Sequence, residues 1–220
     1  NKPSGLVMHP GSGCYDSTLA NGLINRFPEL ENLPRCGIVH RLDKDTSGIL
    51  LVAKNDAFRN YFINEMQERR VVKKYIAVVS GETLGSFEIN DPIGRDKSNR
   101  TKMSIRQDGK EALTYVKLKE KIGNYSILDI RIETGRTHQI RVHLASKKLP
   151  IIGDKTYDPR RTIMKDSSQK IIDIVRSFPR QALHARYLAF KCPETDEEIS
   201  FETPIPKDIK KLIDMLKKHI

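Results

Sequence analysis

The sequence has few cysteines, and their placement excludes several kinds of site. Cys14, Cys36 and Cys192 are odd in number and far apart, so they fit neither a disulfide framework nor a paired CxxC site for zinc or redox chemistry. Unpaired cysteines are typical of a reducing compartment, and we therefore expect a cytoplasmic protein.

Long apolar runs and nucleotide-binding loops are also missing. The longest apolar stretches, such as residues 48–53, are far below the roughly 20 residues of a membrane span, and no signal-peptide pattern opens the chain. No Walker or Rossmann glycine loop occurs, which disfavours enzymes that need ATP or NAD, and no GxSxG elbow marks a hydrolase serine. We expect no membrane partner and no nucleotide cofactor.

A metal site is disfavoured as well. His138 and His143 are five residues apart, without an HExxH pattern and without a cysteine at ligand spacing. A hydrolase that acts through Ser47 or these histidines remains a weak alternative.

What the chain has in excess is positive charge. It contains 39 Lys and Arg against 28 Asp and Glu, a net charge of +11 over 220 residues. A positive charge of this size attracts polyanions, so nucleic acid is the first partner to consider. The alternative is a basic surface that is merely solvated. The length is sufficient for one folded unit with a proper core.

The hydrophobic pattern predicts a chain that contains both helices and strands. Helical spacing is found at 16–27, from a cap at Asp56 to residue 70, at 167–178 and at 206–219. Strand patterns are found at 48–53, 73–81, 112–118, 125–132, 183–190 and 199–202. Residues 97–106 form a basic, loop-rich passage that is either a partner contact or a plain surface loop.

Residues 134–144 predict a turn that leads from a strand into a helix. Gly135 permits a tight turn, Thr137 is a candidate N-cap, and Ile140 with Leu144 gives an apolar pair four residues apart. Such a helix would place His138 and Arg141 one turn apart on a shared face.

The chain is organised around residues 37–54, at whose centre lies Asp43 between Arg41 and Lys44. Apolar neighbours imply partial burial, and a carboxylate that stays ionised in an apolar pocket needs a cation, for which Arg141 is the natural candidate. The alternative is a structural turn residue, a role that Asp45 fits better. Tyr75 likewise fits either a stacking platform or a half-buried strand aromatic.

A nine-residue signature and five further blocks then resemble one family. Residues 40–48, HRLDKDTSG, resemble the signature of the RluA-type pseudouridine synthases. The segments NKPSGLVMHPG, KKYIAVVSG, TGRTHQIRVHLA, PIIGDKTY and RQALHARYLAF resemble further blocks of that family in the same order, over about residues 1–206. Within the family the blocks look most like those of members that act on a stem-loop of large-subunit ribosomal RNA.

The resemblance implies a fold, a reaction and site residues. It implies the pseudouridine synthase fold, a mixed α/β domain with a central, mostly antiparallel sheet, flanking helices and an active-site cleft. It also implies Asp43 as the nucleophile, Tyr75 packed on a flipped uracil as a candidate base for the C5 proton, and Arg141 paired with Asp43. Arg41 would enter the RNA helix that the base has left. We expect further RNA contacts from the basic residues His40, Lys73, Arg136 and His138.

The same resemblance implies which cofactors and which domain organisation to expect. Isomerising uridine involves no redox change and no net group transfer, so no cofactor is expected. We also expect the protein to be a monomer. Residues 1–220 would form a single catalytic domain. The family's strand before NKPSG and the small S4-type RNA-binding domain of many relatives have no counterpart in this sequence. Alternatives are a non-catalytic RNA-binding or ribosome-assembly module of the same fold, and a synthase that acts on tRNA.

Overall fold

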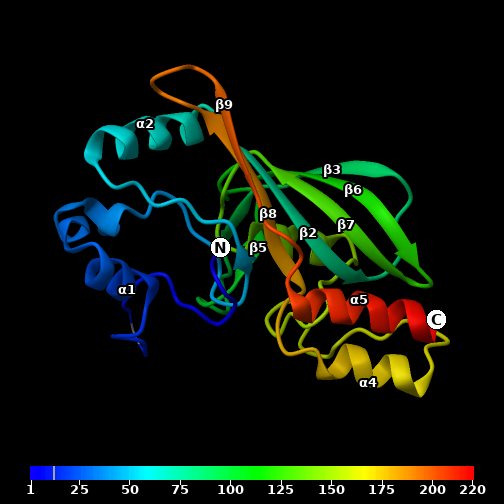
Figure 1. Cartoon of the computed structure of the whole chain (residues 1–220). Helices are drawn as coiled ribbons and strands as arrows, with labels where there is room; N and C mark the ends of the chain where they lie inside the picture. The colour runs from blue at the N-terminus through cyan, green and yellow to red at the C-terminus, as the bar shows by residue number, and fades with distance from the viewer. Residues whose placement is uncertain (12) are drawn as a thin grey trace.

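The computed structural model describes residues 1–11 and 13–220 as a mixed α/β fold around one large sheet (Figure 1). The helices are α1 (Leu19–Arg26), α2 (Asp56–Gln67), α3 (Gln139–Ser146), α4 (Gln169–Ser177) and α5 (Lys207–His219), with two short 3-10 helices, η1 (Pro28–Asn32) and η2 (Pro34–Gly37). The strands are β1 (Ser47–Gly48), β2 (Val72–Ser80), β3 (Ser86–Asn90), β4 (Ile93–Arg95), β5 (Met103–Ile105), β6 (Leu113–Ile122), β7 (Tyr125–Ile132), β8 (Leu183–Lys191) and β9 (Glu198–Glu202).

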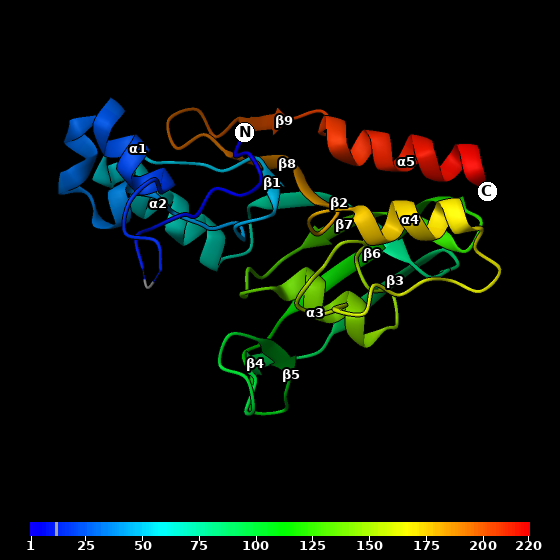
Figure 2. The same cartoon turned by 90° about the horizontal axis from the view of Figure 1, so that it is seen from below.

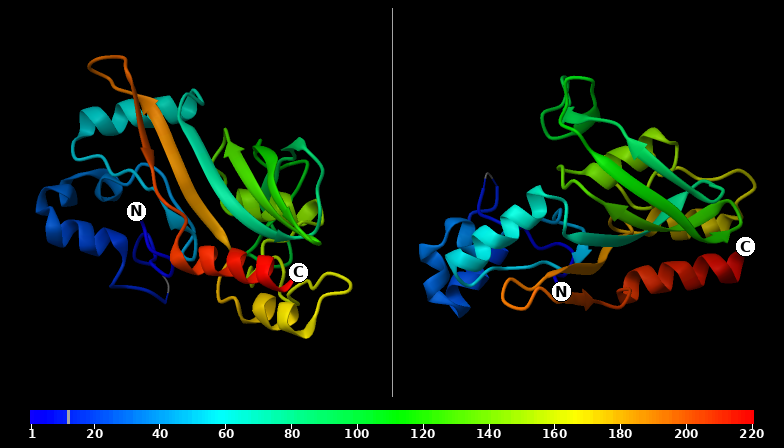
Figure 3. Two further views of the ribbon diagram at one scale, coloured as in Figure 1. Left: turned by 45° about the vertical axis from the view of Figure 1, so that its right-hand side comes forward. Right: turned by 90° about the horizontal axis from the view of Figure 1, so that it is seen from above.

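The sheet has seven strands in the order β1-β8-β2-β7-β6-β3, and β9 also pairs with β8. Every pairing except β1 with β8 is antiparallel. The mostly antiparallel central sheet with flanking helices is therefore confirmed. Strands β4 and β5 form a separate hairpin that projects from the body of the molecule (Figures 2 and 3). Strand β5 of this hairpin lies within residues 97–106, which the sequence predicted to be rich in loops.

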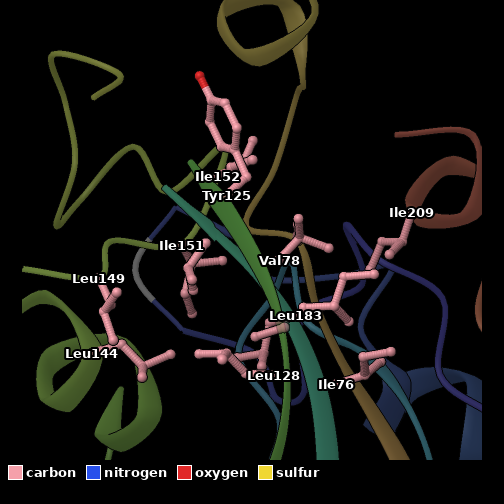
Figure 4. Close-up of a cluster of buried hydrophobic side chains, with 14 of the residues drawn as sticks. Ile76, Val78, Tyr125, Leu128, Leu144, Leu149, Ile151, Ile152, Leu183 and Ile209 are labelled. Atoms are coloured by element: carbon pink, nitrogen blue, oxygen red, sulfur yellow. The ribbon is translucent and has the colours of Figure 1, made fainter. Parts of the chain in front are cut away.

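The core is packed on both sides of β2, β7 and β8. Figure 4 shows Leu144 of α3 on one side of these strands and Ile209 of α5 on the other. Both side chains are fully buried, and both belong to the main hydrophobic cluster. Each such residue contributes roughly 1.5–3 kcal/mol by leaving water. The sheet is thus fixed between helices, and its strands can hold side chains at defined positions.

Local signals explain most helix boundaries. The four apolar residues of the α5 stripe, Ile209, Leu212, Ile213 and Leu216, are all buried, as the period of 3.6 predicted. Helix α2 is capped by the Asn55 side chain, which accepts from the Phe58 N–H at 2.8 Å, and not by Asp56 as expected. Pro206 occupies the N-cap position of α5, one residue before the helix.

The predicted strand at 48–53 is wrong. Only Ser47 and Gly48 form a strand, β1, which runs parallel to β8. Beyond it, Ile49 makes one backbone hydrogen bond to Ala185 and Val52 makes an isolated bridge to Ile38. Ile49 and Leu51 pack against the aromatic cluster of α2 and β8. Leu50 and Val52 pack instead against Ile38 and α1, so the periodicity of this segment did not indicate a ladder.

Gly48 is the point where this segment meets β8. Its φ is +117°, and a Cβ added there would lie 2.1 Å from the Ala185 carbonyl oxygen. We expect Gly48→Ala to lower the free energy of unfolding by about 3 kcal/mol or more, because the backbones must separate. Gly22→Ala in α1 is the matched control, since no atom lies within 4 Å of its Cβ position. Urea unfolding of both variants tests this, and an equal effect of the two would contradict it.

Candidate active site

The structure places Asp43 in a turn whose backbone is tied down from several sides. The Thr46 N–H donates to the Asp43 carbonyl at 3.1 Å. The Gln181 side chain donates to the Thr46 hydroxyl at 3.2 Å, and Arg180 donates to the Asp45 carbonyl at 3.1 Å. These contacts leave the Asp43 side chain 16% exposed at the wall of a cleft. The turn thus presents its carboxylate between the buried residues Leu42 and Thr46.

Helix α3 begins differently from the expectation. Thr137 is not the N-cap; His138 holds that position in the left-handed region, with φ of 57° and no side-chain cap. The Gln139 side chain does the anchoring, since its Oε1 accepts from the Arg136 N–H at 3.0 Å and its Nε2 donates to the Leu113 carbonyl at 3.0 Å. A non-glycine residue in this region costs about 1–2 kcal/mol, and such strain clusters at functional sites.

Arg141 links two carboxylates. Its Nη1 donates to Asp43 Oδ2 at 3.0 Å, which confirms the pairing expected from the sequence. Its Nε and Nη2 donate to the two oxygens of Asp154 at 2.7 and 2.8 Å. Burial alone would lower the pKa of Arg141, but the hydrogen bonds and charges of Asp154 and Asp43 outweigh it and raise that pKa above its usual value. Arg141 therefore remains a cation.

Asp154 was missed as a functional residue at the sequence level. Its side chain is 1% exposed, and it also accepts from the backbone N–H groups of Thr156 and Tyr157. Burial raises its pKa, but the hydrogen bonds and charge of Arg141 together with the backbone donors lower it overall. The one signal for Asp154 in the sequence was its place in the PIIGDKTY block.

Tyr75 comes from β2, where it pairs with Ile130 of β7 and Ala185 of β8. It is 8% exposed and lines the same cleft as Asp43. Burial and the nearby charge of Asp43 raise the pKa of its phenol. The hydroxyl is therefore protonated at neutral pH, and the ring can act as an apolar platform.

The remaining predicted residues also line this cleft, which has a volume of about 650 Å³. Arg41 is exposed at its surface. Lys73 is buried, and this burial, together with the charge of Arg136, lowers its pKa to about 8 against the opposing effect of Glu133. The Arg136 side chain is fixed by a hydrogen bond to the Glu111 carbonyl at 2.8 Å.

His143 and Ser47, which the hydrolase alternative would need, already make hydrogen bonds within the protein. His143 contacts the Thr114 hydroxyl and the Asp91 carbonyl. Ser47 lies 2.9 Å from His184 Nδ1, a pair of the kind found in hydrolases, but both side chains are buried and neither lines the cleft.

Within residues 1–11 and 13–220, no three His, Cys, Asp or Glu side chains are grouped as a metal site would require. In the same ranges no helix is long and apolar enough to cross a membrane.

His40 has an inward contact that predicts acid sensitivity. Its Nε2 accepts from the Leu51 N–H at 2.9 Å, and burial, with the charge of Lys73 adding, lowers its pKa to about 4. An unfolded histidine titrates near pH 6.5, so the unfolded state binds the proton first as pH falls. The stability contributed by neutral His40 is therefore complete above about pH 6.5 and is lost towards pH 4, by up to about 3 kcal/mol.

His40→Gln provides the test, because the glutamine Oε1 can accept from Leu51 but does not titrate. We expect its free energy of unfolding to fall less than that of the wild type between pH 7 and pH 4.5, as measured by urea denaturation. Equal pH dependence of the two proteins would contradict the prediction.

Comparison with known proteins agrees with this geometry. Residues 1–146 match the family model described as RNA pseudouridylate synthase. The chain is 40% identical over 218 residues to the ribosomal large subunit pseudouridine synthase D of Vibrio parahaemolyticus, and the match covers 99% of this chain and 67% of that protein. It is 42% identical over 217 residues to the protein of the same name from Haemophilus ducreyi, with the same coverage. The chain thus spans about two thirds of the length of these relatives.

Solved structures point the same way. Human RNA pseudouridylate synthase domain containing 4 superposes with a TM-score of 0.75 at 23% identity, over 98% of this chain and 88% of that one, which shows the shared fold. Human RNA pseudouridylate synthase domain containing 1 gives a TM-score of 0.68 at 27% identity, over 99% and 89% of the two chains. Together with the family model, which covers most of the chain, these matches establish that the protein belongs to the RNA pseudouridylate synthase family.

Proposed function

We propose that this protein isomerises specific uridines of large-subunit ribosomal RNA to pseudouridine, with Asp43 as the nucleophile. The observation that carries the proposal is the Asp43 carboxylate, partly sheltered in a cleft and held 3.0 Å from the guanidinium of Arg141. Membership of the family supports the reaction, and the names of the relatives at 40–42% identity support the class of RNA.

The reaction balances without a cofactor. The N1–C1′ bond of uridine breaks, the uracil rotates, and a C5–C1′ bond forms; C5 loses a proton and N1 gains one. Asp43 would form a transient covalent bond to the nucleotide, either at the ribose anomeric carbon or at the pyrimidine ring. Both routes need an ionised carboxylate, which the cation of Arg141 favours.

The cleft also suits a base that has left its helix. Extruding a nucleotide from structured RNA costs a few kcal/mol. Stacking on the Tyr75 ring, worth roughly 1–3 kcal/mol, would offset part of this cost. Arg41, which is exposed at the same cleft, would fill the gap in the RNA, and Lys73 and Arg136 would contact phosphates. Because ribosomal RNA is the proposed substrate, we place the protein in the cytoplasm.

Chemical mapping of pseudouridine tests the proposal. Large-subunit ribosomal RNA from a strain lacking this gene is incubated with the protein, and tRNA from the same strain serves as the second substrate. We expect new pseudouridines at a few positions of the ribosomal RNA. Modification of tRNA alone would overturn the substrate, binding without modification would favour the assembly module, and cleaved RNA would favour the hydrolase.

A further inference from the structure

Tyr157 contacts both of the α3 side chains that face Asp43. Its hydroxyl lies 2.8 Å from Nδ1 of His138. Its ring lies against the guanidinium of Arg141, with 5.0 Å between the guanidinium carbon and the ring centroid. The same residue is anchored at its backbone, because its N–H donates to Asp154. None of these contacts was anticipated from the sequence.

The hydroxyl contacts determine which nitrogen of His138 carries the proton. The Met103 N–H donates to the Tyr157 hydroxyl oxygen at 2.9 Å, so this oxygen already serves as an acceptor. Within the described ranges, Nδ1 of His138 is the one acceptor recorded for the hydroxyl hydrogen. Donation to Nδ1 satisfies that hydrogen, whereas the opposite arrangement would leave it without a partner. Neutral His138 therefore carries its proton on Nε2.

The tautomer of His138 determines whether an N–H group or a lone pair faces the Asp43 carboxylate. Nε2 of His138 lies 3.9 Å from Oδ1 of Asp43, on the opposite carboxylate oxygen from the one that Arg141 binds. With the proton on Nε2, the ring nitrogen that lies 3.9 Å from the carboxylate carries a hydrogen, and the positive end of the N–H dipole attracts the carboxylate. With the proton on Nδ1, a lone pair would face the carboxylate and repel it. Burial lowers the pKa of His138 against the opposing charge of Asp43, which agrees with a neutral ring.

We propose that Tyr157 is a positioning residue of this active site, which holds His138 in the Nε2–H tautomer so that His138 and Arg141 together orient the two oxygens of Asp43. The inference rests on the proposed function of Asp43 and changes the role of His138 from an RNA contact to a partner of the nucleophile. At 3.9 Å the His138 contact is longer than a hydrogen bond, and it would tighten once RNA fills the cleft.

The first test reads the tautomer without any RNA. In protein labelled with ¹⁵N-histidine, long-range proton–nitrogen spectra distinguish the two neutral forms, and His138→Gln assigns the signal. We expect the Nε2–H form in the wild type, with a change of the Nδ1 shift in Tyr157→Phe as the hydrogen bond is lost. An Nδ1–H form in the wild type, or no change in the variant, would overturn the inference whether or not the protein makes pseudouridine.

The second test separates tautomer control from simple packing. The amide nitrogen of Gln can stand where Nε2 stands, and that of Asn where Nδ1 stands. We therefore expect His138→Gln to keep the single-turnover rate of pseudouridine formation within about threefold. His138→Asn should be about tenfold slower than the Gln variant, the low end of the range for a hydrogen bond to a charged group. An Asn variant as fast as the Gln variant would contradict a role for a donor at the Nε2 position.

A double-mutant cycle completes the argument. Tyr157→Phe should slow the wild type about tenfold but cause no further loss in the His138→Gln background, where no tautomer has to be fixed. A merely structural role predicts the same loss in both backgrounds, and that result would overturn the proposal. Tyr125→Phe is the matched control, because its buried hydroxyl bonds Ser167 away from the cleft; it should leave the rate unchanged, and the RNA affinity of all variants should stay within about twofold.

Discussion

Asp43→Asn is expected to lower the rate of tritium release from RNA labelled at uridine C5 by about 10³-fold or more. The amide has the shape of the carboxylate but cannot attack the nucleotide, and it still accepts the hydrogen bond that Arg141 donates at 3.0 Å. RNA affinity should therefore be unchanged or slightly higher, since one negative charge is lost from the cleft. Single-turnover release with excess enzyme measures the chemical step apart from binding.

Asp45→Asn is the matched control for this experiment. Asp45 lies in the same turn, two residues further on, but it does not line the cleft. We expect this variant to release tritium at close to the wild-type rate. If Asp43→Asn is as fast as the wild type, Asp43 is not the nucleophile; if Asp45→Asn is as slow as Asp43→Asn, the turn rather than one carboxylate is what matters.

Arg141→Leu should reduce both stability and catalysis. Asp154 is 1% exposed and receives two hydrogen bonds from Arg141, so the variant leaves a buried carboxylate without its cation. Breaking a buried pair in this way costs about 3–5 kcal/mol of folding free energy. The chemical step should slow by about 10²-fold or more, because Asp43 loses its counter-ion as well. Urea denaturation and single-turnover rates measure the two effects.

The double variant Arg141→Leu with Asp154→Leu separates those effects. Replacing both members of a buried ion pair by apolar residues is often neutral for stability, so much of the lost folding free energy should return. The rate should not return, because Asp43 still has no cation beside it. Recovery of the rate together with the stability would show that Arg141 serves only to hold the fold, and would contradict its catalytic role.

Much of the site could be predicted because its residues lie in segments with strong local signals. The strand pattern of residues 73–81 predicted a strand that carries Tyr75, and the structure has it in β2. The helix predicted within residues 134–144 carries Arg141, and His138, which is the N-cap before that helix, also lies beside Asp43. Charge balance then required a cation for a partly buried carboxylate, and Arg141 supplies it from 98 positions along the chain.

The roles of Asp154 and Tyr157 could not be predicted in this way. Neither belongs to a helix or a sheet strand, and each acts through side chains from another part of the chain. The same limit explains the wrong strand at 48–53. Its apolar residues pack into two separate clusters, one with α2 and one with α1, and nothing in their spacing could tell packing from pairing.

The sequence by itself therefore determined the type and period of the main elements, the excess of positive charge and the residue types of the reaction. These follow from local backbone preference and from burial, which act over a few residues at a time. Only the tertiary structure decided that Arg141 is shared between Asp43 and Asp154, and that Tyr157 fixes His138. Such contacts depend on how the sheet and α3 bring distant segments together, because hydrogen bonds and ion pairs act only over a few ångströms.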